Sequence, residues 1–600
     1  MNSNLAADSD WKKLTGAWRY LPALLIVVAA ISYYSSYINY WFNPHDESGT
    51  ACLIAQRLMQ GERPWVDVDT GYNIGWFYPL VAIFKFTGVN LVVARAWFFL
   101  LSTITALLGY GIVARVTGSR WLGLAVGLVL IALPGSQFKN YIPLCEAANL
   151  ACLLALFAVE PGLTRKWLGR LALAGVVLGF TFLLRVEIGF FFTAIWAGVL
   201  LLLLLDHRLN FVRRAAAAVV GAMVLAVGWT AAQAPAYLEL RSRHLEHHLV
   251  DEYASWFSFL RASFRQEFVS AEKPAQLPAP AVTSNATPAG IAPATTTAAP
   301  TESPKAVDSR DRSILARKPL SAIWKGPARD GTLAFLTYAP LLIFPLFLAL
   351  GFGAFVRTVF GGKFTLAAPP LQWLILLGAS LTTFPQFFFF RPDRPHLSEF
   401  MVGYIISLAA CAWLLWPREN SAPRGRRIFA GIVIGFLIVQ LGVYATFALQ
   451  HPSSGTIAAR FRGKTWFKGE NGVHLRGTKR EAAEFQTVLD AVRAHSREGD
   501  YVICYPYMPG YNVMTNRRTY LRNVYVDNST RGENWSERTI REFAEKKPAI
   551  VIIDDRAINS VDSSRFSRWA AQVYEHLQKN YQPVGKFETI EIFARPAAAP

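Results

Sequence analysis

Charged residues are scarce in this 600-residue sequence: they make up 17% of the chain, whereas soluble globular chains have about 25%. A string of soluble domains is therefore a poor explanation of its length. The five cysteines include no CxxC pair and no zinc-finger spacing, which argues against a disulfide framework or a structural metal. No Walker loop, GxGxxG or HExxH motif occurs, and this weighs against an ATP-driven pump or a protease.

Apolar residues, by contrast, make up 53% of the chain, and many stand in runs long enough to cross a hydrocarbon core about 30 Å thick. We therefore predict a mainly α-helical, polytopic membrane protein. The first run lacks a small-residue cleavage site and is expected to be a retained anchor. The eleven expected spans are Tyr20–Phe42, Arg95–Val113, Trp121–Phe138, Leu144–Glu160, Trp167–Leu184, Ile188–Leu205, Ala215–Ala234, Leu333–Val356, Pro370–Phe388, Phe400–Trp416 and Ile428–Leu449.

Two apolar stretches need separate interpretation. Residues 167–205 are too long for one helix, and the charged triplet Arg185-Val186-Glu187 interrupts them, so we predict two spans joined by a turn at the triplet. The run Gly75–Phe86 contains Lys85 and is too short to span a membrane. We expect it to form a helix that lies in the membrane interface.

The net charge of +19 raises the question of a nucleic-acid partner. With eleven spans, however, most basic residues of the short loops fall on one side of the membrane, as the positive-inside tendency requires. We therefore expect no nucleic-acid partner, a cytoplasmic amino terminus, an extracytoplasmic carboxyl-terminal region and a location in a bacterial inner membrane. Counting Gly75–Phe86 as another span would reverse every later loop and destroy this asymmetry.

Three segments are expected on the outer side of a transmembrane module that covers residues 1–450. The first is the polar loop 43–74. The second, residues 237–331, contains an Ala/Pro/Thr tract over 274–304 with too few apolar side chains to offset chain entropy, and we expect this tract to be disordered. The third, residues 451–600, has a soluble composition.

Alternating helical and strand patterns over residues 451–600 predict a small extracytoplasmic α/β domain. Its expected helices are Thr478–His495, Glu537–Lys546 and Ser564–Lys579. Its expected strands are Asp500–Tyr505, Ala549–Asp554 and Lys586–Ala594.

Two carboxylates, Asp46 and Glu47, follow the first span directly, and Ser48–Gln60 has the pattern of a short amphipathic helix. Carboxylates at a membrane boundary suit a site that must deprotonate a hydroxyl, because burial raises a carboxylate pKa toward the working pH. The alternative is a solvated helix start with Asp46 near the N-cap.

The stretch HDESGTACLIAQRLMQGERPWVDVDTGYNIGWFYPLVAIFKFTG, which begins at His45, resembles the first outer loop of GT-C glycosyltransferases. Protein O-mannosyltransferases and the aminoarabinose transferase of lipid A belong to this group, which takes sugars from polyprenyl-phosphate carriers. The resemblance is clear over residues 20–205 and looser afterwards. The matching pieces are Asp46-Glu47, Gly61-Glu62-Arg63-Pro64-Trp65, Asp67, Gly88 and Ala94-Arg95.

The resemblance implies that Asp46 is the catalytic base and that Glu47 helps to hold the acceptor or the base. It also implies a second acidic residue at the outer mouth of the helix after the third span, where Glu146 is the best match. Alternatively, Glu146 is a membrane-edge carboxylate paired with Lys139.

The chain departs from the family in one place. Some relatives have a Glu-Lys-Pro motif, whose lysine approaches the carrier phosphate, where this chain has Gly71-Tyr72-Asn73. The candidates for binding the donor phosphate instead are Arg185, Arg391, Arg394 and His396, because guanidinium groups match phosphate oxygens in a bidentate way. The alternatives are an ion pair between Arg185 and Glu187 and interfacial snorkelling of the other arginines.

The sequence thus favours a glycosyltransferase that moves a sugar from a polyprenyl-phosphate carrier to a lipid-linked glycan, a lipid or a protein on the outer membrane face. The sequence indicates no required cofactor and is compatible with a divalent metal ion. The first alternative is a secondary transporter or flippase of a lipid-linked or anionic substrate, and the second is a membrane scaffold that presents the α/β domain.

Overall fold

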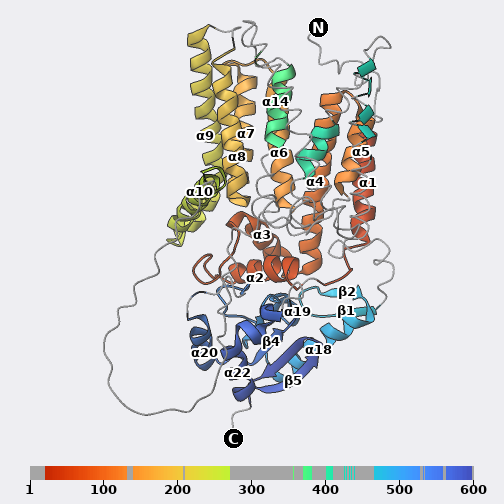
Figure 1. Ribbon diagram of the computed structural model, residues 1–600, viewed down its shortest axis with the longest axis vertical. Coiled ribbons are helices and arrows are strands. Elements are labelled where there is room, and N and C mark those ends of the chain that lie inside the picture. Colours follow the sequence, from red (N-terminus) through yellow and green to blue (C-terminus); the bar gives the residue numbers. More distant parts are fainter. Residues whose placement is uncertain are drawn as a thin grey trace, which may run out of the picture.

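The computed structural model describes residues 20–42, 44–131, 140–206, 210–269, 369–380, 401–409, 465–526, 534–557 and 562–596, with a few single positions elsewhere. A bundle of helices carries a small α/β domain at one end, which we call the domain end of the bundle (Figure 1). The tract 274–304 and the site candidates Arg391, Arg394 and His396 lie outside the described residues, as do most residues of the expected spans Leu333–Val356 and Ile428–Leu449.

Within the described residues, four helices are long and apolar enough to cross a membrane: α4 (Leu91–Thr117), α7 (Arg165–Leu184), α8 (Val186–Leu203) and α9 (Phe211–Ser242). The chain is therefore an integral membrane protein. Shorter apolar helices stand beside them, and the count of eleven spans stays a prediction. These shorter bundle helices are α1 (Leu21–Ser35), α5 (Arg120–Ile131), α6 (Tyr141–Phe157) and α14 (Pro369–Ser380).

Local sequence explains where several of these helices begin and end. The Asn90 side chain accepts hydrogen bonds from the first turn of α4, and Gly118 ends that helix in the left-handed conformation that glycine adopts freely. The expected break at Arg185 is present: α7 ends at Leu184, Arg185 is extended, and α8 begins at Val186.

A layer of short helices lies between the bundle and the α/β domain (Figure 1). The expected helix Ser48–Gln60 is present as a π-helical segment, η2 (Asp46–Leu53), that continues into α2 (Ile54–Met59). The run that was expected to form an interfacial helix forms a 3-10 turn, η3 (Ile74–Trp76), and α3 (Tyr78–Thr87). Beyond α9, helix α10 (Glu246–Val269) packs against α8 and α9.

The C-terminal domain has a four-stranded sheet of order β3-β4-β6-β5, in which β3 and β4 are parallel and the other pairs antiparallel. The strands are β3 (Val502–Tyr505), β4 (Ile550–Asp554), β5 (Gln582–Phe587) and β6 (Ile590–Ala594). A separate hairpin pairs β1 (Thr465–Lys468) with β2 (His474–Gly477). The helices are α18 (Lys479–His495), α19 (Gly510–Thr515), α20 (Trp535–Lys546), α21 (Phe566–Trp569) and α22 (Ala571–Asn580).

Two boundaries of this domain differ from the sequence prediction. The expected strand Lys586–Ala594 is not one strand: it contains the end of β5, a turn and β6. Glu588 has a positive φ of 51° and turns the chain between β5 and β6. The expected helix Ser564–Lys579 is divided at Ala570, the residue between α21 and α22.

Aromatic packing joins the domain to the bundle. The ring of Phe42, which follows α1, lies 4.9 Å from that of Phe485 on α18 and 6.3 Å from that of Tyr511 on α19, measured between centroids. The apolar core therefore continues from the first bundle helix into the domain.

Candidate functional site

The acidic pair opens the π-helical segment at the domain end of the bundle. The carbonyl of His45 accepts hydrogen bonds from the backbone N–H of Thr50 and from its hydroxyl, both at 2.9 Å. A step of five residues is the π-type pattern, which occurs mostly as single turns and often at functional sites. The structure places the backbone of Asp46 and Glu47 in this segment, while their side chains lie outside what it describes.

The C-terminal domain forms direct hydrogen bonds with the residues that lead into this segment. The backbone N–H of Gly510 donates to the Pro44 carbonyl over 2.8 Å. The Tyr525 hydroxyl donates to the His45 carbonyl, and the His45 ring nitrogen Nδ1 is hydrogen-bonded to the carbonyl of Tyr507. The candidate site is thus built from two parts of the chain that are far apart in sequence.

Arg95 of α4 binds the stretch of chain between α1 and the acidic pair. This side chain is fully buried, and its guanidinium donates to the carbonyls of Ile38 and Tyr40, each at 3.0 Å, and to that of Trp41. A charged residue at the start of an apolar helix is costly to bury, so the sequence itself marks Arg95 as a residue that needs a partner.

Arg185 stands over two stacked aromatic rings. Its guanidinium carbon lies 5.4 Å from the ring centroid of Tyr72 and 5.9 Å from that of Trp76, and these two rings stack at 4.2 Å. It also forms a 2.5 Å ion pair with Glu187, whose side chain is 3% exposed. The structure therefore contains the ion pair that was the alternative for Arg185, and it places this arginine over Tyr72 of the segment Gly71-Tyr72-Asn73.

Glu146 lies on α6 inside the helix bundle. It is fully buried on α6, and a Cβ added to Gly403 of the helical segment 401–409 would lie 2.1 Å from its carboxylate oxygen Oε1. Lys139, its expected alternative partner, lies outside the described residues. The carboxylate is thus packed between helices of the bundle.

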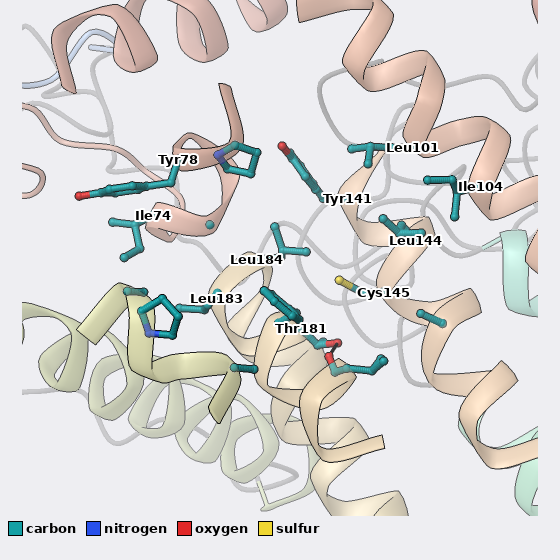
Figure 2. A pocket seen from close by; sticks show the side chains of 18 of the residues that line it. Ile74, Tyr78, Leu101, Ile104, Tyr141, Leu144, Cys145, Thr181, Leu183 and Leu184 are labelled. Carbon is teal, nitrogen blue, oxygen red and sulfur yellow. Dashed lines mark hydrogen bonds between the residues drawn. The ribbon is translucent and has the colours of Figure 1, made fainter. Parts of the chain in front are cut away.

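An apolar cavity of about 620 Å³ opens beside Arg185 among α3, α4, α6, α7 and α9. Leu183 and Leu184, the residues just before Arg185, line it together with Tyr141 and Thr181 (Figure 2). Glu239 of α9 also lines it. The volume falls within the roughly 300–1,000 Å³ of ligand pockets.

Helix α10 packs against α8 and α9, with Glu252 close to Glu187. The Tyr253 hydroxyl donates to Gln233 over 2.9 Å, and Trp256 donates to the carboxylate of Glu252 over 2.9 Å. Burial raises the pKa of the Glu252 carboxyl above its usual 4.5, and the nearby acidic groups of Asp69 and Glu187 raise it further.

No known family model matches this chain, and no curated protein matches it either. Among solved structures, the chain is similar to the crystal structure of ArnT from Cupriavidus metallidurans bound to undecaprenyl phosphate. The two chains share 13% identity with a TM-score of 0.45, over 98% of this chain and 100% of that one. A likeness of this degree transfers no residue role, so the roles proposed below rest on this chain's own sequence and contacts.

Proposed function

We propose that this protein is a GT-C-type glycosyltransferase that moves a sugar from a polyprenyl-phosphate carrier to a lipid-linked glycan, lipid or protein acceptor on the outer membrane face. The observation that carries the proposal is the position of the acidic pair. Asp46 and Glu47 open a π-helical segment at the domain end of the bundle, on the chain segment whose sequence resembles the first outer loop of that family.

In the proposed reaction, the Asp46 carboxylate removes the proton of the acceptor hydroxyl as that oxygen attacks the anomeric carbon of the sugar. The bond between this carbon and the carrier phosphate breaks, and the polyprenyl phosphate leaves with the electron pair. A cation near the leaving oxygen stabilises the added charge. No nucleotide is needed, because the polyprenyl phosphate itself is the leaving group.

Of the four candidates for that cation, Arg185 lies among the residues that the structure describes. The neighbouring cavity is the candidate site for the prenyl chain of the carrier. Leu183 and Leu184 line the cavity and lead directly into Arg185, so a prenyl chain in the cavity would have its phosphate end close to a guanidinium. A bound phosphate would compete with Glu187 for this group. The roles of Glu146, Arg391, Arg394 and His396 stay predictions.

A flippase that moves a lipid-linked substrate without chemistry is the second candidate. The observation in its favour is Glu146, because a carboxylate buried inside a bundle often marks a transport path. One experiment separates the two: purified protein in vesicles receives a radiolabelled polyprenyl-phosphate sugar and a lipid extract. A transferase moves the label into a new product, whereas a flippase changes only the leaflet in which the intact donor lies.

A further inference from the structure

The Tyr525 hydroxyl and the Thr50 hydroxyl meet at one carbonyl oxygen. Tyr525 donates to the His45 carbonyl across 480 positions of sequence, and the Thr50 hydroxyl lies 2.9 Å from the same oxygen. The two hydroxyls are also hydrogen-bonded to each other. This carbonyl therefore accepts from the N–H and the hydroxyl of Thr50 in its own turn and from the Tyr525 hydroxyl of the C-terminal domain.

The carbonyl of His45 and the N–H of Asp46 belong to the same planar peptide group. A bond that fixes the direction of the carbonyl therefore fixes the plane from which the Asp46 backbone continues. The preceding peptide is held too, because Gly510 of the same domain donates to the Pro44 carbonyl over 2.8 Å. Two successive peptides in front of Asp46 thus depend on the C-terminal domain for their orientation.

We propose that Tyr525 is a positioning residue: through the His45 carbonyl it sets the backbone orientation at Asp46, and the C-terminal domain thereby forms part of the active site. The inference rests on the proposed function, in which Asp46 is the base. A base works only when it is held close to the proton it removes, and a displacement of about 1 Å costs on the order of 100-fold in rate.

The first test is the variant Tyr525→Phe, which removes the hydroxyl and keeps the ring that packs 6.0 Å from Tyr507. The matched control is Tyr520→Phe in the same domain, because the buried Tyr520 hydroxyl has no hydrogen-bond partner among the described residues. We expect kcat of Tyr525→Phe to fall by about 10- to 100-fold with KM for donor and acceptor and the melting temperature unchanged. The control should keep the wild-type kcat.

The second test asks whether both hydroxyls act on the same carbonyl. Thr50→Val removes the other hydroxyl at nearly constant shape. If both hydroxyls act on one carbonyl, the loss of kcat in the double variant with Tyr525→Phe should differ from the product of the two single losses. Multiplication of the two losses would mean that the residues act independently, and this would contradict the proposed arrangement.

The third test does not depend on activity. Hydrogen–deuterium exchange of the peptide that covers residues 45–53 should be faster in Tyr525→Phe than in the wild type and in Tyr520→Phe. If exchange there is unchanged and kcat stays within twofold of the wild type, Tyr525 has no positioning role. If the wild type transfers no sugar at all, the proposed function fails, while the exchange rates still decide whether Tyr525 orders the turn.

Discussion

The side chain of Arg95 donates a 3.0 Å hydrogen bond to the main-chain carbonyl of Tyr40, between the end of α1 and the acidic pair. Because the guanidinium is fully buried and serves further carbonyls, Arg95→Met would leave several buried acceptors without a donor. Each such acceptor costs about 1–3 kcal/mol. We expect a clear drop in the melting temperature of the detergent-solubilised protein.

The matched control for this change is Arg115→Met, since Arg115 lies on the same helix and is exposed. Equal melting temperatures for the two variants would show that the hydrogen bonds of Arg95 contribute little to the fold.

The second prediction concerns donor binding by Arg185. Arg185→Lys keeps the charge but loses the planar group that lies over Tyr72 and Trp76 and that can bind a phosphate with two parallel bonds. We expect KM for the polyprenyl-phosphate donor to rise by about tenfold, which corresponds to roughly 1.4 kcal/mol. Arg170→Lys, near the opposite end of α7, is the control. A donor KM that is the same in both variants would remove Arg185 from phosphate binding.

The third prediction concerns the fit between the π-helical segment and the domain. A Cβ on Gly49 would lie 2.2 Å from the Pro44 carbonyl oxygen and 2.9 Å from Cγ of Pro509, so Gly49→Ala must displace the turn or the domain. Overpacking of this kind costs about 1–3 kcal/mol. We expect lower activity and faster proteolysis between bundle and domain. Gly111→Ala, where a Cβ meets nothing within 4 Å, should behave like the wild type, and equal behaviour of both variants would contradict the close packing.

The fourth prediction is a pH dependence in the C-terminal domain. Burial raises the pKa of the Glu484 carboxyl above its usual 4.5, although the Tyr511 hydroxyl donates to it over 2.9 Å. The folded state thus binds this proton more tightly than the unfolded state, and the stability gained below pH 4.5 is lost as pH rises through the folded-state pKa. Glu484→Gln should therefore melt above the wild type at pH 7.

The difference in melting temperature between Glu484→Gln and the wild type should shrink as the pH falls toward 4.5, because the wild-type carboxyl then becomes neutral as well. Glu575→Gln, an exposed change on α22, should show no such trend. A difference that does not vary with pH would mean that ionisation of Glu484 does not destabilise the domain.

Several local features were predictable because their cause is local. The charged triplet at Arg185 predicts the break between α7 and α8, and the capping pair of Thr478 and Glu481 marks the start of α18. The hairpin of β5 and β6 was missed because its turn at Glu588-Thr589 has none of the glycine or asparagine that usually signals one.

The composition of the site was only partly predictable. The acidic pair and Arg185 stand out as charges beside apolar runs, whereas the bond from Tyr525 to His45 joins residues 480 positions apart and leaves no periodic pattern. The cost of a carboxylate inside an apolar run marks Glu146 in the sequence, but its burial against Gly403 depends on a helical segment far along the chain. Long-range packing decides such contacts, and a single sequence does not encode it in any local spacing.

The central claim is that Asp46 is the base of a sugar transfer, and the most direct measurement compares the transfer rates of Asp46→Asn and the wild type with a radiolabelled polyprenyl-phosphate sugar. An amide keeps the shape of the carboxylate but cannot take up the proton, so the rate should fall by about 10²–10⁴ with folding and membrane insertion unchanged. Asp490→Asn, on the exposed face of α18, should keep the wild-type rate. Transfer by Asp46→Asn at close to the wild-type rate would contradict the account.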